Sequence, residues 1–341
     1  MSEADSDYQV AVVGGGPAGL TTALYTTRLG HDTVLIDRGG GRAAMMQDTH
    51  NVIGITEETS GNELLQTAKA QIESYGADTV RGMVSDIDGS AGSFELAVGE
   101  ETYTAERVVL ATGFADERPD PPLPRTGRGL HYCLHCDAYM FVDESVYVMG
   151  TGESAAHVAM IMLNFTDEVD LLLRGDEPQW SEETDQQLRA HPVDVIETEI
   201  SGMNTGEDGW LESFEFEDGT TRAYRGGFPM YGSDYNADLA DALGLERTDD
   251  GNVAVDDHGR TSVDGVSAVG DLTPGHNQIP VAMGEGAKAG IALHYDLRAF
   301  PKSLDELDGE DVDPASTPAI SDDLREAARR RDEVEPAAAD D

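Results

Sequence analysis

Basic residues are scarce in this sequence of 341 residues, which contains 22 Lys and Arg against 67 Asp and Glu. Because proteins contact nucleic-acid phosphates through Lys and Arg, we expect no nucleic-acid partner. The formal net charge of −45 at pH 7 is spread along the whole chain. This dispersal favours a surface adapted to high salt over one acidic patch for a basic partner, since salt screens the repulsion between carboxylates.

Long apolar runs and cysteines are scarce as well. No stretch approaches the roughly 18 apolar residues that a membrane span needs, so we expect no membrane association. The N-terminal residues 1–10 are acidic and polar, whereas a secretory signal starts basic and then apolar. We therefore expect a cytoplasmic protein with room for two domains. Its two cysteines are too few for a disulfide framework.

A strand followed by a glycine-rich turn stands near the start of the chain. The apolar run 8–13 ends in a GxGxxG pattern formed by Gly14, Gly16 and Gly19, after which apolar residues recur at helical spacing. A second short strand delivers Asp37, 21 residues after Gly16. These offsets predict a dinucleotide-binding βαβ unit. The glycines permit a tight turn, the approach of a pyrophosphate and close helix packing, and Asp37 can hydrogen-bond a ribose hydroxyl.

A second turn of the same kind follows 136 residues later. The apolar residues 146–149 lead into a GxGxxA pattern and then into an apolar helix. The next strand ends at Leu173 and Arg174, where NAD would need an acid and NADP would need two or more arginines. The choice between NADPH and NADH, and whether either binds, therefore stays open. The predicted nicotinamide site consists of Gly150, Gly152, Glu153, Ser154, Ala155 and Arg174.

The two cysteines, Cys133 and Cys136, lie three positions apart between the two turns. A zinc site could recruit His131 and His135, but half of a four-cysteine pattern is missing. An inert buried pair is a second alternative. A redox dithiol is favoured because CxxC spacing permits a small disulfide ring and favours the thiolate of one cysteine. Asp137 would supply the proton acceptor that thiol–disulfide exchange needs. We therefore expect a redox site without a metal.

Over about residues 7–300, the chain resembles the low-molecular-weight thioredoxin reductase family. Four further segments resemble motifs of that family: residues 40–41 with 51–54 its flavin loop, 108–113 its ATG strand, 263–271 its second FAD motif, and 277–279 the segment that covers the flavin ring. The resemblance implies bound FAD, held by Gly14, Gly16, Pro17, Ala18, Gly19, Asp37, Arg38, Asn51, Ala111, Thr112, Gly113, Gly270, Asp271, Gln278 and Ile279.

The resemblance also implies an α/β fold with two Rossmann-like domains, the second inserted in the first. Residues 1–118 and 246–300 would form the FAD-binding domain. Residues 119–245 would form a smaller NAD(P)-binding-like domain that carries the dithiol. Residues 301–341 are acidic, and we expect them to be a flexible tail with a short helix capped by an Asp.

In the family that the chain resembles, the second cysteine faces the flavin, the first attacks a substrate disulfide, and the following Asp is the acid/base. Those roles would fall to Cys136, Cys133 and Asp137, with a thioredoxin-like protein as substrate and a homodimer as the assembly. The family's HRR phosphate clamp would fall on residues 173–175 and is mostly missing. Two alternatives follow: a related enzyme fed by ferredoxin, NADH or reduced flavin, and a dithiol oxidase that uses oxygen. A non-enzymatic flavin redox sensor is a third.

Overall fold

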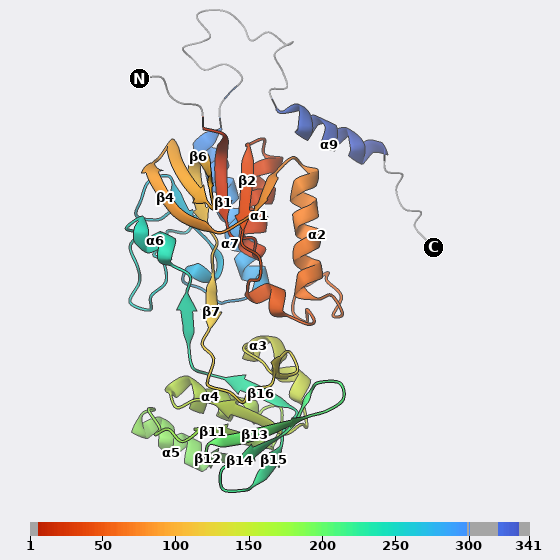
Figure 1. Cartoon of the computed structure of the whole chain (residues 1–341), viewed down its shortest axis with the longest axis vertical. Coiled ribbons are helices and arrows are strands. Elements are labelled where there is room, and N and C mark those ends of the chain that lie inside the picture. The colour runs from red at the N-terminus through yellow and green to blue at the C-terminus, as the bar shows by residue number, and fades with distance from the viewer. Residues whose placement is uncertain (1–5, 299, 301–319, 334–341) are drawn as a thin grey trace, which may run out of the picture. The chain divides into compact units, whose positions relative to one another are not determined.

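The computed structural model describes residues 6–298, 300 and 320–333. Contacts between residues divide the chain into two compact units (Figure 1). The first unit comprises Met1–Ala44, Gly61–Phe114 and Tyr235–Asp341. The second unit comprises Met45–Ser60 and Ala115–Asp234. The chain therefore leaves the first unit twice and returns to it twice.

The first unit contains a seven-stranded sheet with the order β3-β2-β1-β6-β5-β4, in which β18 also pairs with β6. β1, β2, β3, β6 and β18 are parallel, whereas β4, β5 and β6 pair antiparallel. Residues 10–13 and 108–110 are buried, as expected for parallel strands covered on both faces. The strands are β1 (Tyr8–Val13), β2 (Thr33–Asp37), β3 (Asp78–Arg81), β4 (Val84–Ser90), β5 (Ser93–Val98), β6 (Glu101–Leu110) and β18 (Val266–Ala268).

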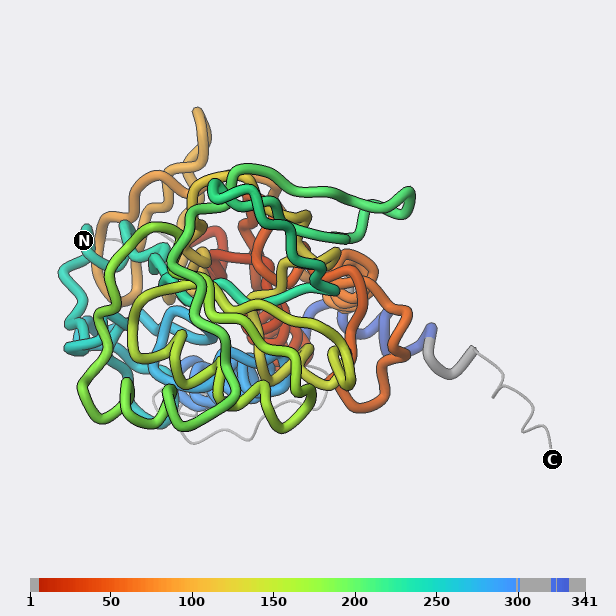
Figure 2. Tube along the Cα trace, turned by 90° about the horizontal axis from the view of Figure 1, so that it is seen from below, coloured from red at the N-terminus to blue at the C-terminus, as the bar shows by residue number. Residues whose placement is uncertain are grey.

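Helices α1 and α7 lie far apart in the sequence but pack against each other in this unit (Figures 1 and 2). Two glycines of α7 permit this approach. A Cβ on Gly286 would lie 2.2 Å from the carbonyl oxygen of Ala18, and one on Gly290 would lie 2.7 Å from Cβ of Tyr25. The helices are α1 (Pro17–Arg28), α2 (Gly61–Ser74), α6 (Asp238–Ala242), α7 (Ile279–Leu297) and α9 (Asp322–Glu333), with the short 3-10 segments η1 (Arg42–Met45) and η3 (Gly270–Leu272).

The second unit repeats the plan on a smaller scale. Its six-stranded sheet has the order β12-β11-β10-β16-β9-β8, and neighbouring strands pair in parallel. A three-stranded antiparallel sheet, β13-β14-β15, belongs to the same unit. Its strands are β8 (Arg125–Thr126), β9 (Gly129–Leu130), β10 (Val146–Met149), β11 (Val169–Leu172), β12 (Val193–Ile196), β13 (Ile200–Thr205), β14 (Leu211–Phe216), β15 (Thr221–Ala223) and β16 (Gly226–Pro229).

Four helical segments complete the second unit: α3 (Leu134–Asp137), η2 (Ala138–Phe141), α4 (Glu153–Met162) and α5 (Glu182–Ala190). Two strands, β7 (Phe114–Asp116) and β17 (Ser233–Tyr235), pair with each other where the chain passes from one unit to the other and back. The α/β fold class with two parallel-sheet, Rossmann-like units is confirmed.

The boundaries of the units differ from those that we expected. The contacts assign Met45–Ser60 to the second unit, whereas the sequence placed the whole stretch 1–118 in the first. They also place the return to the first unit at Tyr235, eleven residues before the expected return at residue 246. The chain crosses at this point on the paired strands β7 and β17, and a pairing between such distant segments leaves no local pattern in the sequence.

The expected helix near the C-terminus is present as α9. Its cap is Ser321 rather than an Asp, since the Ser321 hydroxyl accepts a hydrogen bond of 3.3 Å from the Leu324 N–H. The rest of the expected tail, residues 301–319 and 334–341, lies outside the described residues. Among the helices that the structure describes, none combines the length and the hydrophobicity needed to cross a membrane.

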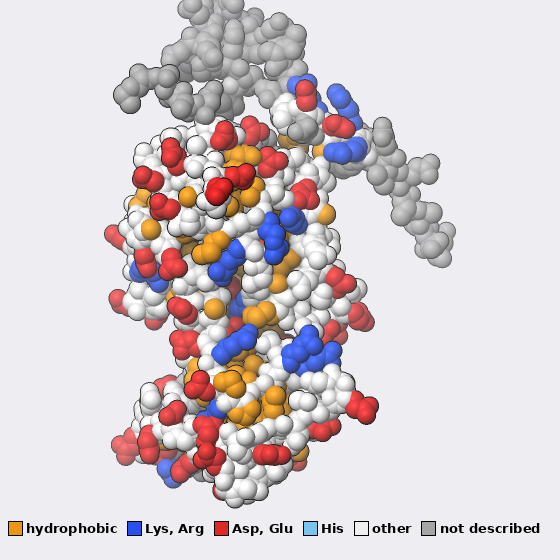
Figure 3. Space-filling model, viewed as in Figure 1, with side chains coloured by type: hydrophobic (Ala, Val, Ile, Leu, Met, Phe, Trp, Pro, Cys, Tyr) orange, Lys and Arg blue, Asp and Glu red, His pale blue; other side chains and the backbone are white. Residues whose placement is uncertain are grey.

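Carboxylates are distributed over the face of the molecule seen in Figure 3, and Lys and Arg side chains are fewer. The structure therefore agrees with the dispersal of acidic residues along the sequence. It does not gather them into one block on that face.

Candidate functional site

The first glycine-rich turn connects β1 to α1 in the first unit. Gly14 has a φ of +112°, and a Cβ there would lie 2.3 Å from the carbonyl oxygen of Ala111. A Cβ on Gly19 would lie 2.0 Å from the Gly14 oxygen. At Gly16, by contrast, a Cβ would meet no atom within 4 Å. Gly16 is the N-cap of α1 and Pro17 its first residue, so the helix N-terminus opens onto free space, which fits a pyrophosphate.

Asp37, the last residue of β2, lies beside this turn. Its Oδ1 accepts a hydrogen bond of 3.0 Å from the backbone N–H of Gly15. The structure therefore brings the predicted ribose-binding carboxylate to the glycine turn. The neighbouring Arg38 donates from Nη2 to Oδ1 of Asn236 at 3.4 Å.

The remaining predicted flavin residues, with one exception, also belong to the first unit. Residues 111–113 directly follow β6, and Gly270 and Asp271 follow β18 in η3. Parallel strands present their carboxyl ends at one edge of a sheet, the usual place for a ligand. Gln278 is the N-cap of α7 and Ile279 its first residue. The exception is Asn51, which belongs to the second unit.

Two residues near these segments were not found from the sequence. Asn236 bridges to Thr112: its backbone carbonyl oxygen accepts from the Thr112 hydroxyl at 2.7 Å, and its Nδ2 donates to the Thr112 backbone carbonyl at 2.9 Å. Glu285 accepts from the N–H of Gly270 at 2.8 Å, and burial is the main cause that raises the pKa of its carboxyl. A usable signal existed only for Glu285, an acid in an otherwise small and apolar stretch of α7.

The dithiol lies at the start of α3 in the second unit. Cys133 and Cys136 form a disulfide, which confirms the predicted pairing. Cys133 is the N-cap of α3, and its Sγ accepts a hydrogen bond of 3.1 Å from the Cys136 N–H. Its carbonyl oxygen accepts from the N–H groups of Cys136 and Asp137. A donor aimed at Sγ stabilises negative charge on this sulfur once the disulfide is opened.

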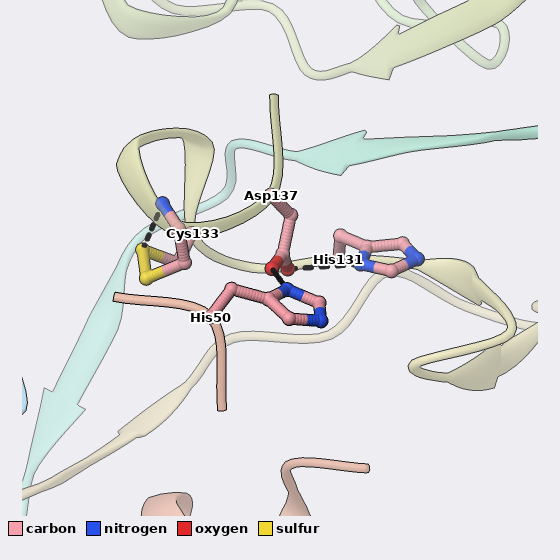
Figure 4. Close-up of a disulfide and its surroundings, with 5 residues drawn as sticks. His50, His131, Cys133 and Asp137 are labelled. Carbon is pink, nitrogen blue, oxygen red and sulfur yellow. Dashed lines mark hydrogen bonds and ion pairs between the residues drawn. A yellow bond between two sulfur atoms is a disulfide. The ribbon is translucent and has the colours of Figure 1, made fainter. Parts of the chain in front are cut away.

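Asp137 follows the disulfide, and Figure 4 shows its carboxylate between two imidazoles. Oδ2 lies 2.9 Å from Nδ1 of His131, within hydrogen-bonding distance. Oδ1 lies 3.8 Å from Nδ1 of His50. His131, considered above as a zinc ligand, is therefore a partner of the carboxylate, and His135 is exposed. Among the described residues, no group of three or more His, Cys, Asp or Glu could hold a metal.

The second glycine-rich turn connects β10 to α4. Gly150 has a φ of +139°, and a Cβ there would lie 2.9 Å from the Met230 carbonyl oxygen. Gly152, the N-cap of α4, has no atom within 4 Å of its Cβ position. Ala155 is buried. The turn thus repeats the first one: its first glycine has no room for a side chain, and the glycine at the helix N-terminus has free space beside it.

The carboxylate of Glu153, the first residue of α4, accepts hydrogen bonds from residues of a later segment of the chain. Its carboxylate accepts from the Thr184 hydroxyl at 2.5 Å and from the Ser181 N–H. The Thr184 hydrogen bond is the main cause that lowers the pKa of Glu153, followed by the bond from Ser181. These contacts hold the segment after β11 beside the glycine turn. Gln179 adds a further link there, from its N–H to the Thr151 carbonyl at 2.7 Å.

Arg174, the one cation predicted for a nicotinamide phosphate, is buried with 8% of its surface exposed. Its Nε donates to Oε1 of Glu199 at 2.8 Å, and its Nη1 donates to the Asp120 carbonyl at 2.5 Å. Its φ of +57° is in the left-handed region. Two exposed acids, Asp176 and Glu177, follow Arg174 closely in the sequence.

Comparison with known proteins places this geometry in a family. Residues 8–286 match the family described as pyridine nucleotide-disulphide oxidoreductase. Thioredoxin reductase of Peptoclostridium acidaminophilum is 31% identical over 305 residues, which cover 83% of this chain and 94% of that protein.

Two solved structures are also similar. That of thioredoxin reductase from Streptococcus pyogenes MGAS5005 has a TM-score of 0.79 at 28% identity and covers 87% of this chain and 100% of that one. That of HlmI has a TM-score of 0.78 at 30% identity and covers 95% and 97%. The chain belongs to the pyridine nucleotide-disulphide oxidoreductase family, and within it resembles the thioredoxin reductases.

Proposed function

We propose that this protein is an FAD-dependent thioredoxin-disulfide reductase whose redox centre is the pair Cys133 and Cys136. The observation that carries the proposal is their disulfide at the start of α3, with a backbone N–H on one sulfur and the Asp137 carboxylate next to the other cysteine. The relatives named thioredoxin reductase favour this activity over an oxygen-dependent dithiol oxidase or a redox sensor.

The first unit would hold FAD. The pyrophosphate would lie at the open N-terminus of α1 beside Gly16, and the Asp37 carboxylate would accept from a ribose hydroxyl. Bound FAD supplies two-electron redox chemistry. The residues of the first unit proposed for this site are Gly14, Gly16, Pro17, Ala18, Gly19, Asp37, Arg38, Ala111, Thr112, Gly113, Gly270, Asp271, Gln278 and Ile279. Asn51, which belongs to the second unit, stays a prediction from the resemblance.

The two cysteines would then divide the chemistry. The Cys133 thiolate attacks a disulfide of the substrate protein, which forms a mixed disulfide and expels one substrate thiolate. Cys136 attacks Cys133 Sγ, which re-forms the Cys133–Cys136 disulfide and expels the second thiolate. The substrate gains two electrons, and the dithiol loses two. Asp137 carries protons between the reacting sulfurs. We take a thioredoxin-like protein as the substrate, a homodimer as the assembly, and the cytoplasm, where thiols are kept reduced, as the location.

Replacing each cysteine separately tests these roles. With Cys136→Ser, Cys133 can still attack oxidised thioredoxin, but nothing resolves the product, so a covalent adduct should accumulate and turnover should stop. With Cys133→Ser, no adduct should form. Non-reducing electrophoresis and mass spectrometry would detect the adduct. Undiminished thioredoxin turnover by Cys136→Ser, or an adduct with the Cys133→Ser protein instead, would refute the assignment.

Two glycine substitutions separate flavin binding from folding. Gly16→Val places its side chain in open space, so the apoprotein should fold, but binding of FAD should fall by about tenfold or more because the pyrophosphate is displaced. Gly19→Val drives a Cβ into the Gly14 carbonyl and should prevent stable folding. Flavin absorbance and thermal unfolding of the apoproteins would measure both effects. A Gly16→Val protein that purifies with a full complement of FAD contradicts the proposed site.

The second glycine turn would bind the nicotinamide donor, at Gly150, Gly152, Glu153, Ser154, Ala155 and the neighbourhood of Arg174. We propose that this donor is NADH. A 2′-phosphate needs free cationic side chains, whereas the Arg174 guanidinium is buried on Glu199. The exposed acids Asp176 and Glu177 would also repel the phosphate.

Anaerobic stopped-flow reduction of the flavin tests the donor. At equal concentrations NADH should bleach the flavin about tenfold faster than NADPH, or more, since each repulsive charge costs NADPH binding free energy. The double variant Asp176→Arg and Glu177→Arg should narrow the difference in rate between NADH and NADPH. Asp249→Arg and Asp250→Arg, two adjacent exposed acids of the first unit, serve as the charge-matched control. Bleaching by NADPH as fast as by NADH would overturn this choice and leave the dithiol proposal intact.

The dispersed carboxylates lead us to propose adaptation to high salt. Raising KCl from about 0.1 M to about 2 M shortens the screening length several-fold and should raise the temperature of unfolding by roughly 10 °C or more. Differential scanning calorimetry of the flavin-bound protein would measure it. An unfolding temperature that is flat or falls with salt would count against this proposal.

A further inference from the structure

His131 is a polar residue in an aromatic pocket of the second unit. Only 5% of its surface is exposed. The ring of Phe141 meets it edge-on with centroids 5.1 Å apart, the indole of Trp210 stacks on it at 6.1 Å, and Phe228 lies at 6.3 Å. A phenylalanine or leucine would fill such a pocket without any polar group to satisfy. The presence of an imidazole therefore needs an explanation.

The polar contact of this imidazole is with Asp137. Because an ionised carboxylate only accepts hydrogen bonds, Nδ1 carries the hydrogen and donates to Oδ2 at 2.9 Å. Nε2 is buried and has no hydrogen-bond partner within the described part of the chain. In this tautomer Nε2 bears a lone pair rather than an unsatisfied N–H. The ring is thus oriented by one polar link, to the carboxylate beside the dithiol (Figure 4).

The second oxygen of Asp137 has different surroundings. Oδ1 lies 3.8 Å from Nδ1 of His50, and the His50 ring meets the ring of Tyr139 edge-on at 5.6 Å. The pKa of Tyr139 is raised first by burial and then by the charges of Glu57, Asp137 and Asp48. His131 therefore faces one oxygen of Asp137 and His50 faces the other. Tyr139, which packs on His50, is the group on which the charges of Glu57, Asp137 and Asp48 act. Oδ2 is committed to His131, and Oδ1 is the oxygen left to exchange a proton.

We propose that His131 is a positioning residue for proton transfer by Asp137. The proposal rests on the dithiol function proposed above. When the Cys133 thiolate attacks a disulfide, a substrate thiolate leaves with the bonding electron pair and needs a proton. That proton comes from the Cys136 thiol by way of Oδ1 of Asp137, and the resulting Cys136 thiolate closes the protein disulfide. The Nδ1–H of His131 holds Oδ2, and so keeps Oδ1 turned toward the exchange.

A comparison of two disulfide probes tests this role. The flavin-bound protein, reduced anaerobically with a stoichiometric amount of dithionite, is mixed with 5,5′-dithiobis(2-nitrobenzoate) or with bis(2-hydroxyethyl) disulfide. The aromatic thiolate is a weak base and leaves without a proton, whereas the alkyl thiolate is basic and leaves faster when protonated. The rate at which oxidised flavin absorbance returns is measured for each probe.

In His131→Phe the pocket stays filled but the donor is lost, so the alkyl probe should react about tenfold more slowly and the aromatic probe less than about threefold more slowly. His131→Asn places an amide N–H near the position of Nδ1 and should recover most of the alkyl rate. In an Asp137→Asn background, His131→Phe should cause no further loss, because its effect passes through the carboxylate.

Equal slowing with both probes in His131→Phe, or no recovery in His131→Asn, would show that the histidine only supports the fold and would overturn the proposal. So would additive losses in the double variant. If the unmodified protein reacts with neither probe, the dithiol function itself fails and this inference fails with it. Flavin content and unfolding temperature of each variant identify any that is simply misfolded. If His131→Phe misfolds, His131→Leu, which also fills the pocket without a donor, replaces it in the comparison with His131→Asn and in the Asp137→Asn background.

Discussion

Backbone contacts with no room for a side chain hold the first glycine turn in place. Gly14 lies against the Ala111 carbonyl, Gly19 lies against the Gly14 carbonyl, and Gly286 of α7 lies against the Ala18 carbonyl. Together they fix the N-terminus of α1 against the ends of β1 and β6 and against α7. The proposed ligand site of the first unit depends on these close contacts. They fix the start of α1 in a position where the space beside Gly16, its N-cap, is free.

In the second unit, too, a backbone contact leaves no room for a side chain, here between two neighbouring strands. A Cβ on Gly227 of β16 would lie 1.9 Å from the Tyr147 carbonyl of the adjacent strand β10. The Tyr147 hydroxyl then donates to the Gly129 carbonyl at 2.6 Å from within the core. These contacts hold β9, β10 and β16 together, and the segment that follows β9 carries His131 and the dithiol. The position of the redox centre in this unit thus follows from close packing of its sheet.

Much of this could be predicted from the sequence because it depends on short-range spacing. The offsets among Gly14, Gly16, Gly19 and Asp37 specify a strand, a turn, a helix and a second strand, and these elements are present. The CxxC spacing likewise favoured a redox disulfide over a zinc site or an inert pair, and the disulfide is present. The α/β class followed from two such turns in one chain.

The rest depends on contacts between segments that are distant in the sequence. Asn236 contacts Thr112 because β17 pairs with β7, which brings together the residues that flank the two strands. No local sequence pattern predicts this contact. Arg174 was included in the possible nicotinamide site, whereas its pairing with Glu199 could be seen only once β11 and the segment before β13 were known to be adjacent. His131 and His50 approach Asp137 from separate segments. Such partners follow from tertiary packing, which the spacing of residues does not encode.

The central claim is that the Cys133–Cys136 disulfide exchanges electrons with a bound flavin. An anaerobic reductive titration of the flavin-bound protein with dithionite tests it most directly. We expect an uptake of about four electrons per flavin, two for the flavin and two for the disulfide, and about two in a Cys136→Ser protein. An uptake of about two electrons in the unmodified protein, with the disulfide still intact, would contradict it.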